Sequence, residues 1–259
     1  MTLSEDKIKK AWNAESLTSG LYVFPELDST NRYLKELAEN NVPEWTVVAA
    51  DSQSKGRGRM GRSFFSPEGT GIYMSVLLKP EIALEKSVRI TSMAAVAVAE
   101  AIEKVSGVRA QIKWVNDIYL NKKKACGILV EAGIDAMACK LNYAVLGIGI
   151  NVGAMEFPEE LQDIATSVAN ESGLTVSREE LIAEVLKSLQ KWYPSIHDGS
   201  FLMESKRRSV LLEKKIRVHN HDGSFYEAVA VDLDDMGHLV IEREGQTELL
   251  NSGEVSVRL

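Results

Sequence analysis

The sequence contains few residues of the kinds that build disulfide frameworks or metal sites. Only two cysteines, Cys126 and Cys139, occur among 259 residues, and both stand in apolar, strand-like surroundings. This number excludes a small disulfide-rich scaffold, and we expect both side chains to be reduced thiols in the core. The four histidines fall late in the chain and lack the spacing of metal ligands. The sequence therefore gives no reason to assign them a metal or catalytic role.

Long apolar segments are also absent. No stretch approaches the roughly 18 uninterrupted apolar residues of a membrane-spanning helix, and residues 1–10 are polar and charged. We therefore expect a cytoplasmic protein without a signal peptide. The formal net charge of −7 argues against nucleic acid as the main partner. The content of 45% apolar and 26% charged residues is typical of a soluble globular protein with a substantial core.

The apolar periodicity predicts helices that alternate with short strands. Helices are expected at residues 31–40, 85–105, 178–192 and 200–212. Strands are expected at residues 46–50, 71–78, 110–115, 118–120, 125–132 and 141–152. The last four strands follow one another with only turns between them. We therefore expect an α+β fold, a mixed β-sheet with flanking helices.

The C-terminal tail has a different pattern from the rest of the chain. From Glu213 onward apolar and polar residues alternate, and turn residues such as Asp222-Gly223 and Met236-Gly237 separate the alternating segments. This pattern predicts several short strands that form a small SH3-like β-barrel. The chain also exceeds the usual length of one domain. We expect a catalytic domain at residues 1–212 and the barrel at residues 213–259.

The strongest chemical signal is a basic, glycine-rich run. Residues 55–62 read KGRGRMGR, which places four cations and three glycines among eight residues without an acid. Glycine lets backbone N–H groups turn toward an anion, and guanidinium groups match phosphate oxygens in pairs. The run therefore predicts a loop that binds a small anion. An exposed, solvated basic loop is the alternative.

The glycine spacing of this run also fits G-x-G-x-x-G, the dinucleotide-binding pattern. That pattern requires a helix directly after the glycines, whereas Pro67, Gly69 and Gly71 follow here and oppose a helix. No Gly-Lys-Ser or Gly-Lys-Thr closes the run, which excludes a Walker A loop. The run therefore predicts a phosphate loop of another kind.

A second cluster combines Lys-Trp-Val-Asn-Asp at residues 113–117 with three lysines at residues 122–124. An Asn-Asp pair between apolar strands is typical of a hairpin turn, and a lysine triplet is typical of a solvated turn. A lysine at the end of one strand, beside an Asp on its neighbour, is also suited to neutralise a carboxylate or phosphate. Both interpretations are compatible with the cluster alone.

Five ordered motifs together resemble the biotin protein ligase family. They are Asp28-Ser29-Thr30-Asn31, Gln53 with the basic run, Lys113 to Asp117, Lys124 with Gly127-Ile128-Leu129-Val130-Glu131, and Gly147-Ile148-Gly149-Ile150-Asn151. The resemblance runs from about residue 21 to residues 252–258, which are similar to the last strand of the family's small barrel. It implies a fold like that of class II aminoacyl-tRNA synthetases, with an SH3-like barrel appended.

The chain departs from the family pattern at two points. Val115 stands where the family usually has proline, a change that affects turn stiffness rather than chemistry. The segment before Leu21 is too short for the winged-helix DNA-binding domain of some members. The resemblance therefore implies a monofunctional biotin–[acetyl-CoA-carboxylase] ligase without DNA binding.

The family's first half-reaction joins the biotin carboxylate to the α-phosphorus of ATP, which gives biotinyl-5′-AMP and pyrophosphate. The resemblance implies that Arg59 is the main cation at the reacting anions and that Arg57 assists it. Lys124 would approach from the opposite side. Asp117 would orient the nucleotide or a Mg²⁺ ion, whose protein ligands the sequence leaves unknown.

The resemblance also assigns substrate contacts. The residues expected to bind biotin are Ser29, Thr30, Asn31, Gln53, Gly56, Arg57, Lys124, Gly127 and Leu129. Those expected to bind ATP or the adenylate are Arg59, Arg62, Phe64, Asn116, Asp117 and Asn151. Phe64 would stack on the adenine, and a plain core aromatic is the alternative.

In the second half-reaction a lysine of a biotin carboxyl carrier protein or domain attacks the adenylate. Water would do the same, so we expect residues 56–65 to be mobile without ligand and to fold over the adenylate. A homodimer through strand edges near residues 114–120 or 141–150 is possible in this fold. No membrane partner is expected.

Two other functions compete with this interpretation. Lipoate protein ligase shares the fold and the adenylate chemistry, but lipoate has no ureido group to match Ser29, Thr30, Asn31 and Gln53. A nucleic-acid-binding protein would use the Arg/Gly run, but it would need a broad basic face with exposed aromatic residues. The acidic balance of the chain opposes that alternative.

Overall fold

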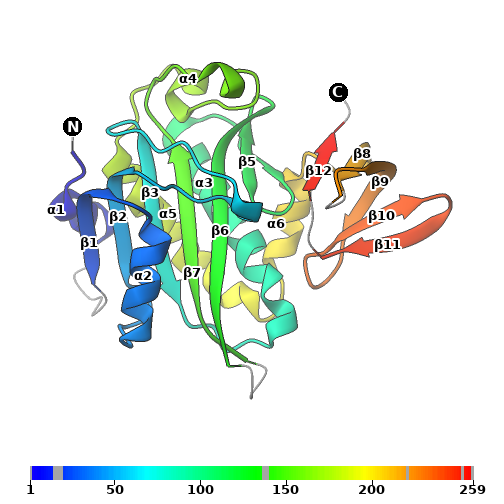
Figure 1. The fold of residues 1–259 in the computed structure, drawn as a ribbon, viewed down its shortest axis with the longest axis horizontal. Helices are drawn as coiled ribbons and strands as arrows, with labels where there is room; N and C mark the ends of the chain where they lie inside the picture. The colour runs from blue at the N-terminus through cyan, green and yellow to red at the C-terminus, as the bar shows by residue number, and fades with distance from the viewer. Residues whose placement is uncertain (1, 14–19, 136–139, 220–221, 252–253, 258–259) are drawn as a thin grey trace.

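Two β-sheets organise the chain in the computed structural model, which describes residues 2–13, 20–135, 140–219, 222–251 and 254–257 (Figure 1). The larger sheet has seven strands in the order β1-β2-β3-β7-β6-β5-β4. These are β1 (Leu21–Leu27), β2 (Val47–Gln53), β3 (Gly71–Leu78), β4 (Gln111–Lys113), β5 (Asp117–Leu120), β6 (Lys123–Asp135) and β7 (Lys140–Asn151). The pair β1 and β2 is parallel and the other neighbours are antiparallel, so the expected mixed sheet is confirmed.

The smaller sheet is built from the C-terminal tail and is antiparallel, in the order β11-β10-β9-β8-β12. Its strands are β8 (Lys214–His219), β9 (Phe225–Leu233), β10 (Leu239–Arg243), β11 (Gln246–Leu250) and β12 (Glu254–Val257). This sheet lies beside the β4 and β5 end of the larger one (Figure 1). The predicted small C-terminal β-structure is confirmed, although its strand β11 shows none of the apolar alternation on which that prediction rests.

Helices cover the larger sheet. They are α1 (Glu5–Trp12), α2 (Thr30–Glu39), α3 (Val88–Ser106), α4 (Val168–Ser172), α5 (Arg178–Trp192) and α6 (Phe201–Arg208). α2 packs its Leu34 and Ala38 against Val48, Leu77 and Val145 of the sheet. α3 is apolar around most of its surface and is buried between the strands, α5 and α6. No helix among the described residues is long and apolar enough to cross a membrane.

Some predicted boundaries agree with the structure, whereas β2, β4, β6 and the start of α3 differ from the predicted bounds by one to three residues and the end of α6 by more. β3 and α5 span the predicted residues, and α3 ends at Ser106, one residue beyond the predicted end, where Gly107 with a φ of 70° forms the left-handed cap. α6 ends at Arg208, four residues before the predicted end at Leu212. The reason is that Ser209 and Val210 bridge to Ile112 of β4, with Val210 N–H donating to the Ile112 carbonyl at 3.0 Å.

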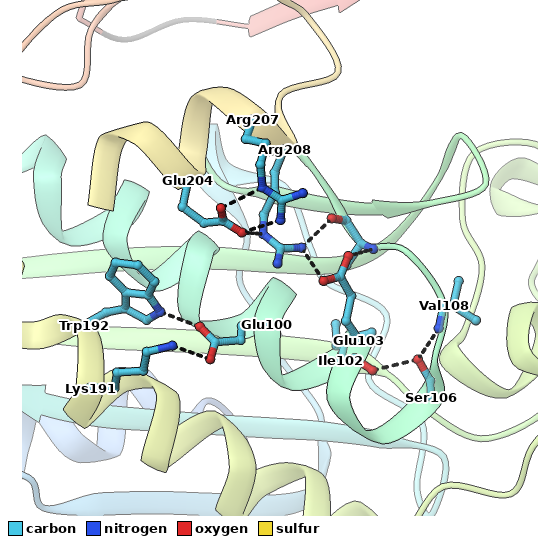
Figure 2. Close-up of polar contacts among 11 residues, drawn as sticks. Glu100, Ile102, Glu103, Ser106, Val108, Lys191, Trp192, Glu204, Arg207 and Arg208 are labelled. Atoms are coloured by element: carbon cyan, nitrogen blue, oxygen red, sulfur yellow. Dashed lines mark hydrogen bonds and ion pairs between the residues drawn. The ribbon is translucent and has the colours of Figure 1, made fainter. Parts of the chain in front are cut away.

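Arg208 anchors this transition into the smaller sheet (Figure 2). Its buried guanidinium pairs with Glu204 at 2.6 Å and Glu103 at 2.8 Å, and it donates to the Ala110 carbonyl at 3.1 Å. Hydrogen bonds from Arg207, with the nearby charge of Arg208, lower the pKa of the Glu204 carboxyl to about 2. These contacts join α6 to α3 and to the start of β4.

The two sheets also share a core at the Lys-Trp-Val-Asn-Asp turn. Trp114 and Val115 are buried in the same apolar cluster as Ile216, Leu239 and other residues of the smaller sheet. The Trp114 indole Nε1 donates to the Gly237 carbonyl, between β9 and β10, at 2.9 Å. The Trp114–Val115 peptide bond is cis.

The expected dimerisation edges are wrong. β5 pairs with both β4 and β6, and β7 pairs with both β3 and β6, so residues 117–120 and 141–150 are interior to the sheet. Their backbone groups already have partners. Cys126 is a buried free thiol, as expected. Cys139, His221, Ser252, Gly253 and Arg258 lie outside the described residues.

Candidate active site

Glycines clear the middle of one face of the larger sheet. Gly149 pairs across the strands with Tyr73 and Gly127, and Gly147 pairs with Ser75 and Leu129. A Cβ added at Gly147 would lie 2.2 Å from Asn31 Oδ1, and one at Gly149 would lie 2.6 Å from the Phe64 ring. The missing side chains therefore let an amide and an aromatic ring approach the strand backbone.

The N-terminus of α2 brings three predicted biotin-binding residues to this face. Ser29, Thr30 and Asn31 are all buried. The Thr30 N–H and hydroxyl donate to Gln53 Oε1 at 2.9 and 3.2 Å. Gln53 extends from the end of β2, so the sheet fixes the position of the α2 N-terminus.

Ser75 and Glu131 complete this polar group, although neither was predicted as a site residue. The Ser75 hydroxyl lies 2.6 Å from Asn31 Oδ1 and 2.8 Å from Thr30 Oγ1. The Asn31 amide Nδ2 donates to Glu131 Oε2 at 2.9 Å and to the Leu129 carbonyl at 3.3 Å. Buried polar groups with this many partners are held in a defined orientation.

The basic loop turns back on itself above the polar group. Gly58 N–H donates to the Arg62 carbonyl at 2.7 Å, and Phe64 N–H donates to the Gly56 carbonyl at 3.0 Å. No helix follows the loop, which agrees with the rejection of a dinucleotide-binding turn. A Cβ at Gly56 would lie 2.4 Å from the Phe64 carbonyl, so the close return of the chain requires glycine there.

Hydrogen bonds tie the end of this loop to the sheet. Gln53 Nε2 donates to Ser66 Oγ at 3.2 Å, and Ser66 Oγ donates to the Phe64 carbonyl at 2.9 Å. The Tyr73 hydroxyl donates to the Pro67 carbonyl at 2.9 Å. Burial raises the pKa of Tyr73 to about 12, so this phenol stays neutral and remains a donor.

The Lys-Trp-Val-Asn-Asp turn carries partners for two of the predicted cations. Arg59 Nη1 donates to Asn116 Oδ1 at 3.0 Å, and Lys124 Nζ pairs with Asp117 Oδ1 at 2.7 Å. Asn116 is itself fixed, because its Nδ2 donates to the Ile128 carbonyl at 3.0 Å and its own carbonyl accepts from Ile128 N–H at 2.9 Å. The turn therefore positions one cation from the loop and one from β6.

Two cavities meet at these cations. The smaller, of about 50 Å³, lies over the glycine face, and the larger, of about 410 Å³, lies between the basic loop, the turn and residues 157–165. Five residues line both cavities: Gly58, Arg59, Phe64, Asn116 and Lys124. A molecule that spanned both cavities would contact both Arg59 and Lys124.

The structure gathers nearly all of the predicted site residues around this pair of cavities. The smaller cavity is lined by the predicted residues Ser29, Thr30, Asn31, Gln53, Arg57, Arg59, Phe64, Asn116, Lys124, Gly127 and Leu129. The larger is lined by the predicted residues Arg59, Arg62, Phe64, Asn116, Asp117, Lys124 and Asn151. Gly56 lines neither cavity and instead supports the loop.

No group of three or more His, Cys, Asp or Glu side chains within the described ranges has the arrangement of a metal site. Asp117 is the acidic residue that lines the larger cavity. Mg²⁺ commonly binds through one or two carboxylates together with substrate phosphates. The donor set therefore fits a Mg²⁺ ion that arrives with a nucleotide.

Comparison with known proteins places the chain among ligases. Residues 23–151 match the model of the Biotin/lipoate A/B protein ligase family, and residues 211–258 match the Biotin protein ligase C terminal domain. The chain is 38% identical over 262 residues to the bifunctional ligase/repressor BirA of Bacillus spizizenii, and the match covers 98% of this chain and 79% of that protein.

Two further comparisons agree. The chain is 26% identical over 244 residues to the biotin–[acetyl-CoA-carboxylase] ligase of Mycobacterium tuberculosis, across 91% of this chain and 88% of that one. A structure of the biotin protein ligase from Aquifex aeolicus, in complex with biotin and ATP, superposes with a TM-score of 0.78 and 31% identity. That alignment covers 92% of this chain and 98% of the other.

Proposed function

Because the chain belongs to the biotin/lipoate A/B protein ligase family, we propose that it activates biotin with ATP and transfers it to a lysine of a biotin carboxyl carrier protein or domain. The observation that carries this proposal is the meeting of two cavities at Arg59 and Lys124. A reaction between two anions needs fixed positive charge where they meet.

In the first half-reaction a biotin carboxylate oxygen attacks the α-phosphorus of ATP. The new C–O–P linkage forms as the bond from the α-phosphorus to the bridging oxygen breaks, and pyrophosphate leaves. Arg59 and Lys124 stabilise the charge that builds on the phosphoryl oxygens, while Arg57 assists at the carboxylate. Their partners Asn116 and Asp117 hold the two main cations in place before substrate binds.

The smaller cavity suits the neutral ureido ring of biotin. The buried residues Ser29, Thr30 and Asn31 and the half-buried Gln53 offer donors and acceptors, and Leu129 adds apolar surface for the rest of the molecule. Such a site discriminates against a molecule that lacks the matching polar groups, because its own buried polar groups would lose their partners.

The larger cavity suits the nucleotide. Phe64 lies on its wall and presents a ring for the adenine, and Asn151 is held there by its own hydrogen bond to the Thr166 carbonyl at 3.0 Å. Arg62 supplies further positive charge. Asp117 would contribute to a bound Mg²⁺, which neutralises phosphate charge when present.

In the second half-reaction the lysine amine of the carrier attacks the acyl carbon of biotinyl-5′-AMP. An amide bond forms, AMP leaves, and the amine loses a proton. We propose that residues 56–65 shield the adenylate from water and become more ordered once it forms. The relatives named as acetyl-CoA-carboxylase ligases support a carrier of that class as the acceptor.

The proposal has narrower parts as well. The catalytic unit extends to residue 212 and the smaller sheet forms a separate unit from residue 213. A cytoplasmic location agrees with the use of ATP and with the free thiol of Cys126. The net charge of −7 gives no support to a DNA partner, and a homodimer would need a contact other than the paired strands β5 and β7.

Pyrophosphate release from Mg·ATP with biotin, with lipoate or with neither acid tests the proposal. Biotin-dependent release is expected, with a fall of roughly two orders of magnitude in Arg59→Ala and Lys124→Ala. Lys104→Ala is the matched control, because Lys104 pairs with Glu184 away from both cavities. Release with lipoate alone would favour lipoate ligation, and no release with either acid would refute acid activation.

A further inference from the structure

One carboxylate contacts both halves of the smaller cavity. Glu131 lies on β6, on the same face as Gly127 and Leu129, and its side chain is 22% exposed. Its Oε2 accepts from Asn31 Nδ2 at 2.9 Å, and its Oε1 pairs with Arg57 Nη1 at 3.0 Å. The carboxylate therefore spans from the helix terminus beneath the cavity to the basic loop above it.

The first of these contacts fixes the orientation of an amide. An ionised carboxylate only accepts hydrogen bonds, so Asn31 must turn its Nδ2 toward Glu131. This leaves Asn31 Oδ1 facing the Ser75 hydroxyl at 2.6 Å. With the opposite orientation, Asn31 would direct an oxygen at the carboxylate, which is unfavourable. Glu131 thereby fixes the orientation of the Asn31 amide, with Nδ2 on the side of Glu131 and Oδ1 on the side of Ser75.

The second contact holds an exposed cation. The Arg57 side chain is 53% exposed, so nothing in its burial restricts its rotamers. A guanidinium has five N–H donors, so it can bind Glu131 through one edge and a second carboxylate through another. Glu131 therefore keeps Arg57 at the cavity, where a substrate carboxylate can meet it.

We propose that Glu131 is a positioning residue that orients Asn31 for recognition of the biotin ring and holds Arg57 for the activation step. This inference rests on the proposed function of the site and adds a residue that acts through two others. Its carboxylate has two separable tasks, one through Asn31 on biotin binding and one through Arg57 on the activation step.

The two tasks predict distinct kinetic effects. In Glu131→Gln an NH₂ group replaces one of the two carboxylate oxygens. The remaining oxygen can then accept from Asn31 or from Arg57, but not from both as the carboxylate does. We expect KM for biotin to rise about tenfold and kcat for pyrophosphate release to fall about tenfold, the size typical of a lost charge-assisted hydrogen bond. A residue that only stabilises the fold would change the melting temperature without this pattern.

Double-mutant cycles test the proposal. In an Arg57→Ala background, Glu131→Gln should lower kcat no further but still raise KM. In an Asn31→Ala background, it should leave KM unchanged but still lower kcat. Glu184→Gln, which disturbs a lysine pair on a distant surface, should alter neither constant. If Glu131→Gln fails to fold, Glu131→Asp keeps the charge but is too short for both contacts, and it should show the same split.

The outcomes separate the two proposals. Effects that multiply independently in both backgrounds would overturn the role of Glu131 while leaving biotin activation in place. Wild-type protein that releases no pyrophosphate with biotin would overturn the proposed function and this inference with it. Effects that disappear in the matching background, and only there, would establish that Glu131 acts through Asn31 and Arg57.

Discussion

The Gly147→Ala substitution is expected to weaken biotin binding and to destabilise the fold. The added methyl group would lie 2.2 Å from Asn31 Oδ1. A normal carbon–oxygen contact needs about 3.2 Å, so Asn31 must shift by roughly 1 Å. That residue is held by Ser75 at 2.6 Å and Glu131 at 2.9 Å, and these bonds lengthen or break when it moves.

The magnitude follows from two opposing effects. Overpacking a filled site costs about 1–3 kcal/mol, and each strained buried hydrogen bond adds about 1 kcal/mol. Replacing glycine in an unstrained strand conformation stabilises the fold by about 0.4–1 kcal/mol. With both of these hydrogen bonds strained, the net loss of unfolding free energy is then about 2–5 kcal/mol. Biotin affinity should fall at least about tenfold, because the displaced Asn31 lies in the binding cavity.

Calorimetric titration with biotin, without ATP, measures the affinity, and thermal unfolding measures the stability. Gly153→Ala is the matched control, since the nearest atom to its added methyl group is the Thr70 carbonyl oxygen at 3.5 Å, an ordinary contact. The control should bind biotin like wild type. Gly147→Ala protein that binds within about twofold of wild type would refute the argument that Asn31 is confined against the strand.

Two more predictions concern titration. The depressed pKa of Glu204, about 2, means that its charged form stabilises the fold above pH 4.5 and loses this effect as the pH falls toward 2. Glu204→Gln should lower the unfolding free energy by about 1–2 kcal/mol at pH 7, after allowance for partial exposure, and by less in urea titrations at pH 3; an equal loss at both would contradict the assignment. Burial raises the pKa of the Cys126 thiol, so native protein at pH 8 should leave it unalkylated by iodoacetamide while urea exposes it. Mass spectrometry of its peptide checks this, and rapid native labelling would disprove it.

The elements that the sequence predicted well are those whose local signals agree with their packing. α5 begins at a Ser177 cap whose hydroxyl accepts from Glu180 N–H, and β3 is an apolar run bounded by glycine and proline. β11 escaped prediction because Gln246, Thr247 and Glu248 show no apolar alternation, and its pairing with β10 forms the strand. Tertiary contact, rather than local preference, decides such segments.

The site could be predicted where its residues form local combinations that are unusual for this sequence. Arginines between glycines, and Asn-Asp beside a lysine, stand out in an acidic chain. Ser75 and Tyr73 did not stand out, because strand residues with hydroxyl groups are common and only the register places them beside Gly147 and Gly149. The one available signal was Ser75 as the lone serine in a wholly buried strand.

The shared burial of Trp114 and Val115 restricts how this protein can be recombined with its relatives. The two residues belong to the turn that holds Arg59 and Lys124, yet their side chains lie in the core of the smaller sheet. A chimera that exchanged residues 213–259 alone would pack Trp114 against the core of a relative's C-terminal sheet. It would also displace the carbonyl of residue 237, which accepts the hydrogen bond from the Trp114 indole. The turn and the C-terminal sheet therefore have to be exchanged together in such a chimera, although about a hundred residues of chain separate them.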